Sequence, residues 1–181
     1  MSQKIFLIRH CQATGQEPEA RLTENGKRDS LMLAQFLQNE PIEAIYCSPF
    51  ARAIETAAPL AKNLNLTIKT DNRLKERTLS RENLSDWFER LKATFSDFSV
   101  KYAGGESSQE AMNRAVHVVE GILDSKIPSA AVVTHGNLMS LILHHFDQQY
   151  GFETWKALTN PDVYLLNFQN DDRVLIKRLW C

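Results

Sequence analysis

The sequence lacks the features of several specialised classes of protein. Its 181 residues contain no apolar run near the roughly 18 residues that cross a bilayer, so we expect no membrane span. Lysine and arginine number 21 against 22 aspartates and glutamates. This balance argues against a nucleic-acid partner, because phosphate backbones are bound by clustered cations. No internal repeat or linker is visible, and a composition with 43% hydrophobic and 24% charged residues is typical of one globular domain.

Cysteines are few and widely spaced. Cys11, Cys47 and Cys181 form no CxxC pair, and no cysteine–histidine set has the spacing of a zinc site. We therefore expect reduced thiols and no metal. The apolar stretch at residues 5–8 is too short for a secretory signal, and with the reduced thiols it favours a cytoplasmic protein. The sequence carries no signal for an oligomeric state.

Short apolar segments alternate with segments of helical periodicity. Continuous apolar runs bounded by polar residues are typical of buried parallel strands. They lie at 4–8, 42–46, 66–70 and 130–134. Helical spacing appears at 23–40, 54–61, 82–95, 107–127 and 137–145, and a hairpin is expected at 163–168 and 174–179. The alternation predicts an α/β fold, a three-layer α/β/α sandwich whose central sheet is mostly parallel with an antiparallel edge strand.

Basic side chains follow three of the predicted strands. Arg9 and His10 come directly after the first strand, and His135 and Gly136 after the strand at 130–134. Arg52 falls in the first turn of the helix after the second strand. Ligands of open α/β sheets bind beyond the carboxyl ends of strands, and helix N-termini attract anions. Two arginines and two histidines at one edge of the sheet predict a site for a phosphate dianion.

Taken singly, each residue has a simpler interpretation. His10 and His135 could be hydrogen-bonded structural histidines, Arg9 a surface arginine, and Arg52 the partner of Glu55. Their joint placement at strand-to-helix transitions favours a shared site over four separate structural roles.

Five motifs resemble those of the histidine phosphatase superfamily, also called the phosphoglycerate mutase-like family. They are LIRHC at 7–11, SPFARAIETA at 48–57, LKE at 74–76, GGES at 104–107 and VTHGN at 133–137. They occur in family order over most of the chain. The resemblance implies a phosphoglycerate mutase-like fold in a single domain, 1–181, with residues 71–106 as a small lid insertion.

The resemblance also implies roles for the matched residues. His10 would take the phosphoryl group from a small phosphorylated substrate, and Glu76 would give a proton to the leaving oxygen. Arg9, Arg52 and His135 would complete the catalytic set by holding the phosphate oxygens. The expected substrate-binding residues are Arg9, Gln16, Arg52, His135 and Gly136, with Gln16 in place of a family asparagine. No cofactor or metal is expected, because guanidinium groups supply the positive charge.

Elementary chemistry supports these roles. Phosphoryl transfer is accelerated mainly by positioning and charge stabilisation. A neutral imidazole is nucleophilic, and cationic neighbours should push the pKa of His10 down and keep it neutral. Glu76 must hold a proton at the start, and we expect burial or the neighbouring Glu106 carboxylate to favour that form.

The chain departs from the family at Cys11, where the motif has glycine. Glycine permits backbone conformations that cysteine resists, so His10 could be displaced. The His-Cys pair also suggests a cysteine phosphatase, His-Cys-x5-Arg, but Glu17 occupies the arginine position, and Cys47 lies one residue too close to Arg52. We therefore favour the histidine mechanism.

Hydrolysis is favoured over mutase chemistry because mutases must exclude water under longer insertions. The alternatives are a phosphoglycerate mutase-type phosphotransferase and a phosphate-binding non-enzyme weakened by Cys11. Within the lid, the aromatic residues either line a substrate pocket or pack the lid on the core. Arg77 and Arg81 either meet a substrate anion or are solvated. The lid aromatics are Trp87, Phe88, Phe95 and Phe98.

Overall fold

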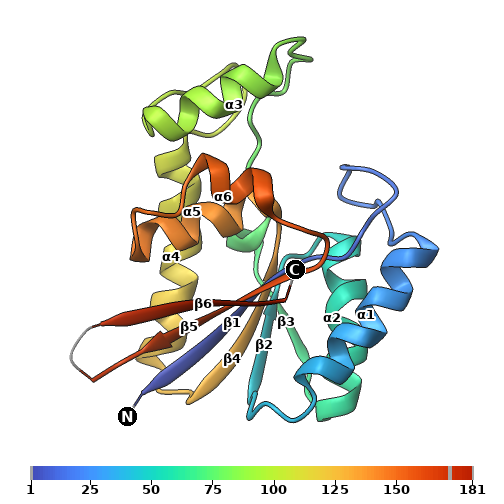
Figure 1. Cartoon of the computed structure of the whole chain (residues 1–181). Coiled ribbons are helices and arrows are strands. Elements are labelled where there is room, and N and C mark those ends of the chain that lie inside the picture. The colour runs from blue at the N-terminus through green and yellow to red at the C-terminus, as the bar shows by residue number, and fades with distance from the viewer. Residues whose placement is uncertain (1, 171–172, 181) are drawn as a thin grey trace.

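The computed structural model describes residues 2–170 and 173–180, and its centre is a six-stranded sheet of order β3-β2-β4-β1-β5-β6 (Figure 1). The strands are β1 (Gln3–Arg9), β2 (Ala44–Cys47), β3 (Ile68–Thr70), β4 (Ser129–Thr134), β5 (Asp162–Phe168) and β6 (Val174–Trp180). The first four run parallel, while β5 and β6 are antiparallel to their neighbours. The expected mixed sheet is confirmed, with two antiparallel strands at one edge instead of one.

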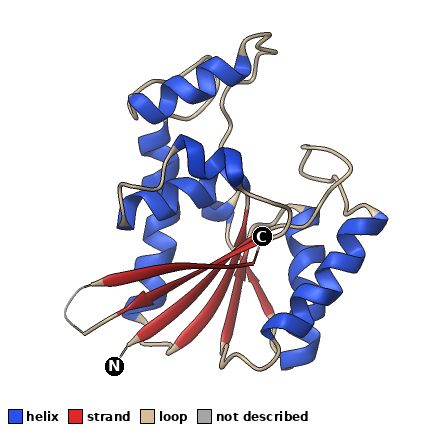
Figure 2. Ribbon diagram, viewed as in Figure 1, coloured by secondary structure: helices blue, strands red, loops and turns tan. Residues whose placement is uncertain are grey.

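Helices cover both faces of this sheet (Figures 1 and 2). One face carries α1 (Glu24–Leu37) and α2 (Ala51–Leu64), and the other carries α4 (Ser108–Asp124) and α5 (Gly136–Phe146). Successive residues of β1 therefore enter different cores. Ile5 and Leu7 pack with α4 and α5, whereas Phe6 and Ile8 pack with α1 and α2. A strand buried on both faces explains why the sequence at 5–8 is continuously apolar.

Helix starts follow from capping residues visible in the sequence. Thr23 caps α1 by accepting a hydrogen bond from the backbone N–H of Gly26 at 3.0 Å. Ser107 and Glu110 form a reciprocal capping box at the start of α4, with distances of 2.8 and 3.1 Å. Each satisfies backbone donors that have no partner inside the helix.

The segment 71–106 differs most from the sheet and its helices. It holds a short 3₁₀ turn, η1 (Asn72–Leu74), a long irregular stretch, and α3 (Trp87–Ser96), which starts five residues later than the periodicity predicted. Figure 1 shows α3 at the top of the molecule, beyond α6 (Phe152–Ala157). The sequence did not predict α6, because six residues without a buried side chain give no periodic pattern.

No helix in the described part of the chain is both long and apolar enough to cross a membrane.

Candidate active site

Two neighbouring parallel strands bring the histidines together. β1 and β4 are in register, so that Arg9 lies opposite Thr134, and the N–H of His10 donates to the Thr134 carbonyl at 3.0 Å. His10 and His135 each follow one of these strands. Their ring centroids are 5.1 Å apart in an edge-to-face arrangement. The structure therefore places both histidines at the carboxyl edge of the sheet, as predicted.

Arg52 joins them from the first turn of α2. It is 1% exposed, and its Nε donates to His10 Nε2 at 3.2 Å. Its Nη1 donates to two backbone carbonyls in segment 16–17, at 3.2 and 2.8 Å. The alternative partner, Glu55, instead pairs with Arg21 at 3.1 Å. Arg52 is thus fixed by backbone carbonyls and not by a carboxylate, which keeps its positive charge available beside His10.

The hydrogen bonds of His10 define its protonation. Nδ1 lies 2.7 Å from the carbonyl oxygen of Cys11, which can only accept, so this nitrogen carries the hydrogen. Nε2 accepts from Arg52 and therefore presents a lone pair. Burial, aided by the charges of Arg52 and Arg9, lowers the pKa of His10 to about 3 against the opposing hydrogen bond to Cys11. The imidazole is neutral at physiological pH.

Arg9 reaches the same place with one end of its guanidinium anchored. Nη1 donates to the carbonyls of Leu158 and Thr159 at 3.0 and 3.2 Å. Nε is buried and has no hydrogen-bond partner among the described residues. The backbone of Gly136 lies against this guanidinium, since a Cβ there would be 3.0 Å from Arg9 Nε. A buried donor without a partner costs free energy unless a ligand satisfies it.

His135, like Arg9, has one side-chain nitrogen in a hydrogen bond and one buried nitrogen without a partner in the described residues. It is fully buried, and its Nε2 lies 2.7 Å from Ser48 Oγ, while Nδ1 finds no partner within the described chain. Burial and the nearby His10, Arg52 and Arg9 hold the pKa of His135 well below its usual value. The buried amide of Asn137, two residues on, is also unpaired within the described ranges. Several buried side-chain nitrogen and oxygen atoms near His10 therefore have no hydrogen-bond partner in the described residues.

Glu76 occupies the N-terminus of α5. Its Oε2 accepts from the N–H of Asn137 at 3.0 Å, and its Oε1 accepts from the N–H groups of Leu138 and Arg77 at 3.0 and 2.8 Å. The prediction that this helix start offers free N–H groups to phosphate was wrong for Asn137 and Leu138, because Glu76 already takes both. Side chains must therefore supply the donors for an anion.

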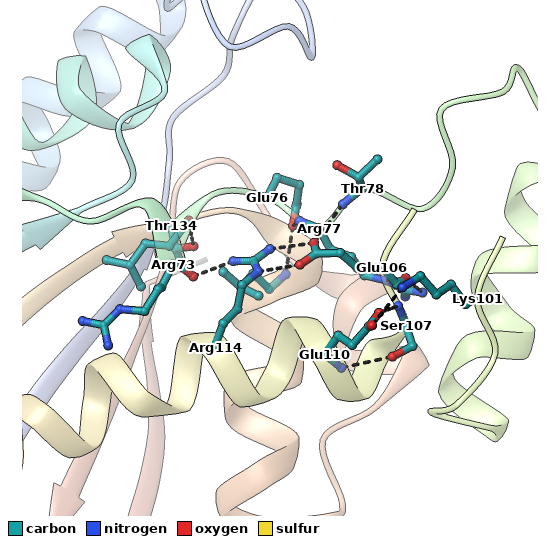
Figure 3. Close-up of polar contacts among 12 residues, drawn as sticks. Arg73, Glu76, Arg77, Thr78, Lys101, Glu106, Ser107, Glu110, Arg114 and Thr134 are labelled. Atoms are coloured by element: carbon teal, nitrogen blue, oxygen red, sulfur yellow. Dashed lines mark hydrogen bonds and ion pairs between the residues drawn. The ribbon is translucent and has the colours of Figure 1, made fainter. Parts of the chain in front are cut away.

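Glu106 was expected to favour the protonated form of Glu76, but its own carboxylate is paired with an arginine. Its carboxylate is held by Arg114 through two hydrogen bonds, at 2.7 and 2.9 Å, and accepts a third from the Thr78 N–H at 3.4 Å (Figure 3). Burial opposes ionisation of Glu106, but these contacts and the nearby Arg77 bring its net pKa below the usual value. Glu106 is thus a paired carboxylate in a network of polar residues.

A pocket of about 550 Å³ opens beside this cluster. Its lining includes Arg9, Gln16, Glu76, Gly136 and Asn137, and the rest comes from residues 77–91 and Trp155. His10 is not part of this lining and is only 7% exposed. Of the predicted set, Gln16 is the most exposed to solvent, and it contributes its carbonyl to Arg52.

Arg77 is buried, so the interpretation of it as a solvated residue was wrong, although it does line the pocket. It is buried, with Nη1 donating to Thr94 and Ser108 and with Nε and Nη2 both donating to the Glu106 carbonyl at 3.1 and 2.9 Å. Burial lowers its pKa. Its hydrogen bonds join the segment 71–106 to the start of α4.

The replacement of the motif glycine by Cys11 requires no unusual backbone. The non-glycine residues with positive φ in the described chain are Asn65 and Lys126. The Cys11 side chain is buried in the core beneath α1 and α2, and its N–H donates to Thr56 Oγ1 at 2.9 Å. Burial raises the pKa of Cys11 to about 12 and that of Cys47 to about 12, so neither thiol is ionised at neutral pH.

Sequence reasoning missed one supporting segment. Asn160 Nδ2 donates to the carbonyl of His10 at 2.8 Å, and the adjacent carbonyls of Leu158 and Thr159 hold Arg9. These residues lie about 150 positions after the first strand, and no motif marks them. The pairing of β1 with β5 brings them to the site.

Comparison with known proteins defines the class. The family model described as histidine phosphatase superfamily (branch 1) matches residues 5–179, so the chain belongs to this superfamily, as the motifs predicted. Phosphoserine phosphatase 1 of Hydrogenobacter thermophilus is 29% identical over 137 residues, which cover 67% of this chain and 63% of that protein.

Solved structures share the fold. A mycobacterial glucosyl-3-phosphoglycerate phosphatase has a TM-score of 0.77 at 20% identity, over 99% of this chain and 98% of its own. The phosphoglycerate mutase of Bacillus anthracis has a TM-score of 0.76 at 15% identity, over 98% of this chain and 92% of its own. The mixed α/β fold is thus that of phosphoglycerate mutase-like proteins.

Proposed function

We propose that this protein is a metal-independent phosphomonoester hydrolase that works through a phosphohistidine on His10. The observation that carries the proposal is the pair of buried nitrogens without a partner in the described residues, Arg9 Nε and His135 Nδ1, near the neutral imidazole of His10. A phosphate dianion would accept from Arg9 Nε, and from His135 in the tautomer that protonates Nδ1. The family and the phosphatase relatives support the same assignment.

The first half-reaction forms a P–N bond. When phosphate binds, Arg52 Nε–H turns from His10 Nε2 to a phosphoryl oxygen, which frees the Nε2 lone pair. This lone pair attacks phosphorus while the P–O bond to the alcohol breaks, and Arg9, Arg52 and His135 stabilise the charge on the phosphoryl oxygens. The Nδ1–H bond to the Cys11 carbonyl stabilises the ring as it becomes cationic. Glu76 transfers a proton to the leaving oxygen. Its Oε2 accepts one N–H bond against two at Oε1, so Oε2 is the oxygen with room for the proton.

The second half-reaction returns the protein to its starting state. Water attacks phosphorus, the P–N bond breaks, and Glu76 takes the proton from the attacking water. Hydrolysis, not transfer to a second substrate, is supported by the short 71–106 segment, which we propose as a lid with the single helix α3. The raised pKa values of Cys11 and Cys47 favour imidazole over thiolate as the nucleophile.

The test is release of inorganic phosphate from a panel of phosphomonoesters without any primer. We expect turnover by the wild type and its loss in His10→Ala, with the exposed His117→Ala on α4 as the matched control. Hydrolysis by His10→Ala at the wild-type rate would remove His10 from the mechanism. Interconversion of 2- and 3-phosphoglycerate that depends on 2,3-bisphosphoglycerate would instead identify a mutase.

A further inference from the structure

The pocket lining includes a group of large apolar side chains. They are Leu84, Trp87 and Leu91 from the segment 71–106 and Trp155 from α6, and Ser80, Glu82 and Asn83 lie beside them in the lining. Trp87 is 51% exposed, an unusual exposure for so large an apolar side chain. An exposed aromatic group at the rim of a pocket is available to a ligand.

Aromatic contacts hold this group in a fixed shape. Trp155 stacks on Phe152 at 5.6 Å, and Phe88 meets Phe152 edge-on at 5.5 Å. Phe88 also contacts Trp87 at 5.7 Å, and Phe95 reaches Phe152 from the same helix at 5.8 Å. The cluster therefore joins α3 to α6 across the pocket, so both expected roles of the lid aromatics, packing and pocket lining, are combined here. A preformed group of this kind avoids the entropy cost of ordering side chains on binding.

The charges of the pocket exclude a second acidic group on the ligand. Of the described residues that line it, Arg9 and Arg77 are the cations; Arg9 belongs to the phosphate end and Arg77 is bonded internally. Arg81 packs its aliphatic part on Gly104, where an added Cβ would be 2.8 Å from Arg81 Cδ. Glu82 adds a negative charge to the lining. A carboxylate beyond the phosphate would meet this charge, and of the cations in the described lining only Arg9 and Arg77 could offset it.

The geometry points to a leaving-group subsite for an apolar, preferably aromatic, alcohol without a second acidic group, with Trp87 and Trp155 as specificity-determining residues. The assignment rests on the proposed phosphatase function, because it places the phosphate at Arg9 and the ester carbon chain along the tryptophans. It distinguishes this chain's substrate from phosphoglycerate and phosphoserine, whose carboxylates the pocket does not accommodate.

Two primary alkyl esters test the subsite without a bias from leaving-group acidity. We expect kcat/KM for 2-phenylethyl phosphate to exceed that for 3-phosphoglycerate by about tenfold or more. Trp87→Ala and Trp155→Ala should reduce this ratio by about tenfold, whereas Phe36→Ala, an aromatic residue 44% exposed on α1, should leave it unchanged. A ratio near one, or a preference for 3-phosphoglycerate, would overturn the assignment.

A gain of function avoids any dependence on correct folding of the tryptophan variants. Glu82 is exposed, and Glu82→Lys should raise kcat/KM for 3-phosphoglycerate by about tenfold while leaving 2-phenylethyl phosphate nearly unchanged. No gain for the carboxylated ester would contradict the charge argument.

A binding measurement distinguishes failure of the proposed subsite from failure of the proposed phosphatase activity. Calorimetry should show 2-phenylethylphosphonate binding at least about tenfold more tightly than 3-phosphonopropionate, and Trp155→Ala should remove the difference. If no ester is hydrolysed yet this preference is present, the phosphatase proposal fails and the subsite stands. If turnover occurs and the two phosphonates bind equally, the subsite fails alone.

A separate observation concerns the loop that carries Glu76. Arg114 on α4 donates two hydrogen bonds to the Glu106 carboxylate and one to the backbone carbonyl of Arg73. The Glu106 carboxylate also accepts from the N–H of Thr78. Figure 3 shows these contacts on either side of Glu76. The Arg114–Glu106 pair thus fixes the backbone two residues after Glu76 and three residues before it.

We infer that Arg114 is a positioning residue that acts through Glu76. Proton donation matters most when the leaving alcohol is a poor leaving group, so the inference predicts a leaving-group dependence. Arg114→Met should lower kcat/KM, which reports transfer of the phosphoryl group to His10, about tenfold more for 2-phenylethyl phosphate than for p-nitrophenyl phosphate. The effect should be in the direction of Glu76→Gln, and Arg114→Lys should recover part of the loss. Equal losses on both esters would show that Arg114 is merely structural and would overturn the inference.

Discussion

Gly136 is the residue whose substitution most directly tests how Arg9 is held. It begins α5 directly after His135, and a Cβ at this position would lie 3.0, 3.1 and 3.2 Å from Nε, Cζ and Nη2 of Arg9. Favourable carbon contacts require about 3.5–4.0 Å. The guanidinium in Gly136→Ala must therefore shift by roughly half an ångström.

Arg9 cannot yield freely, because its Nη1 is tied to the carbonyls of Leu158 and Thr159. A misplacement of about 1 Å in a catalytic array costs on the order of a hundredfold in rate, so half of that shift predicts a loss of about tenfold in kcat/KM. Folding should be retained, since alanine is the best helix former.

The assay is steady-state hydrolysis of 2-phenylethyl phosphate, with thermal unfolding measured in parallel. The control is Gly121→Ala on α4, where an added Cβ meets nothing within 4 Å in the described structure. This control should keep full activity and gain about 0.5–1 kcal/mol in stability. Wild-type kcat/KM in Gly136→Ala would refute the claim that close packing at Gly136 positions Arg9.

Two other predictions follow from buried titratable groups. In the unfolded chain His10 binds a proton below its ordinary pKa of 6.5, whereas in the folded protein it does so only near pH 3. The contribution of His10 to the free energy of unfolding is therefore fully present above pH 6.5 and is lost as the pH falls from about 6.5 towards 3. Between about pH 7.5 and 5 this lowers the free energy of unfolding by about 2 kcal/mol, measured by urea titration, and His10→Gln should remove that part of the slope; an unchanged slope would contradict it. Cys11 and Cys47, with pKa values raised to about 12, should resist iodoacetamide at about pH 8 in the folded protein, as followed by peptide mass mapping. Rapid alkylation of either thiol before unfolding would refute this.

The sequence predicts which residues meet at the carboxyl edge of the sheet, because the determinants of their placement are local. Arg9, His10 and His135 each follow an apolar run, and parallel strands place their carboxyl ends at one edge of the sheet. Arg52 is located by a strand-to-helix turn of the same kind. For these residues, position in the chain and direction of the strand are enough to predict a meeting point.

The remaining contacts depend on tertiary packing that no local pattern encodes. The segment 158–160 holds Arg9 and His10 only because β5 pairs antiparallel with β1. From the sequence alone Arg77 is expected to be a surface charge, yet the segment 71–106 buries it against Thr94 and the Glu106 carbonyl. Trp155 lies on a helix too short to show periodicity.

The most direct measurement of the central claim is acid–base stability of the phosphoenzyme. The wild type is mixed rapidly with ³²P-labelled phosphomonoester, quenched and digested, and the label is mapped by mass spectrometry. We expect label on His10 that survives alkali and is lost in acid, and no label in His10→Ala. Label that is stable in acid, or that lies on any other residue, would contradict the claim.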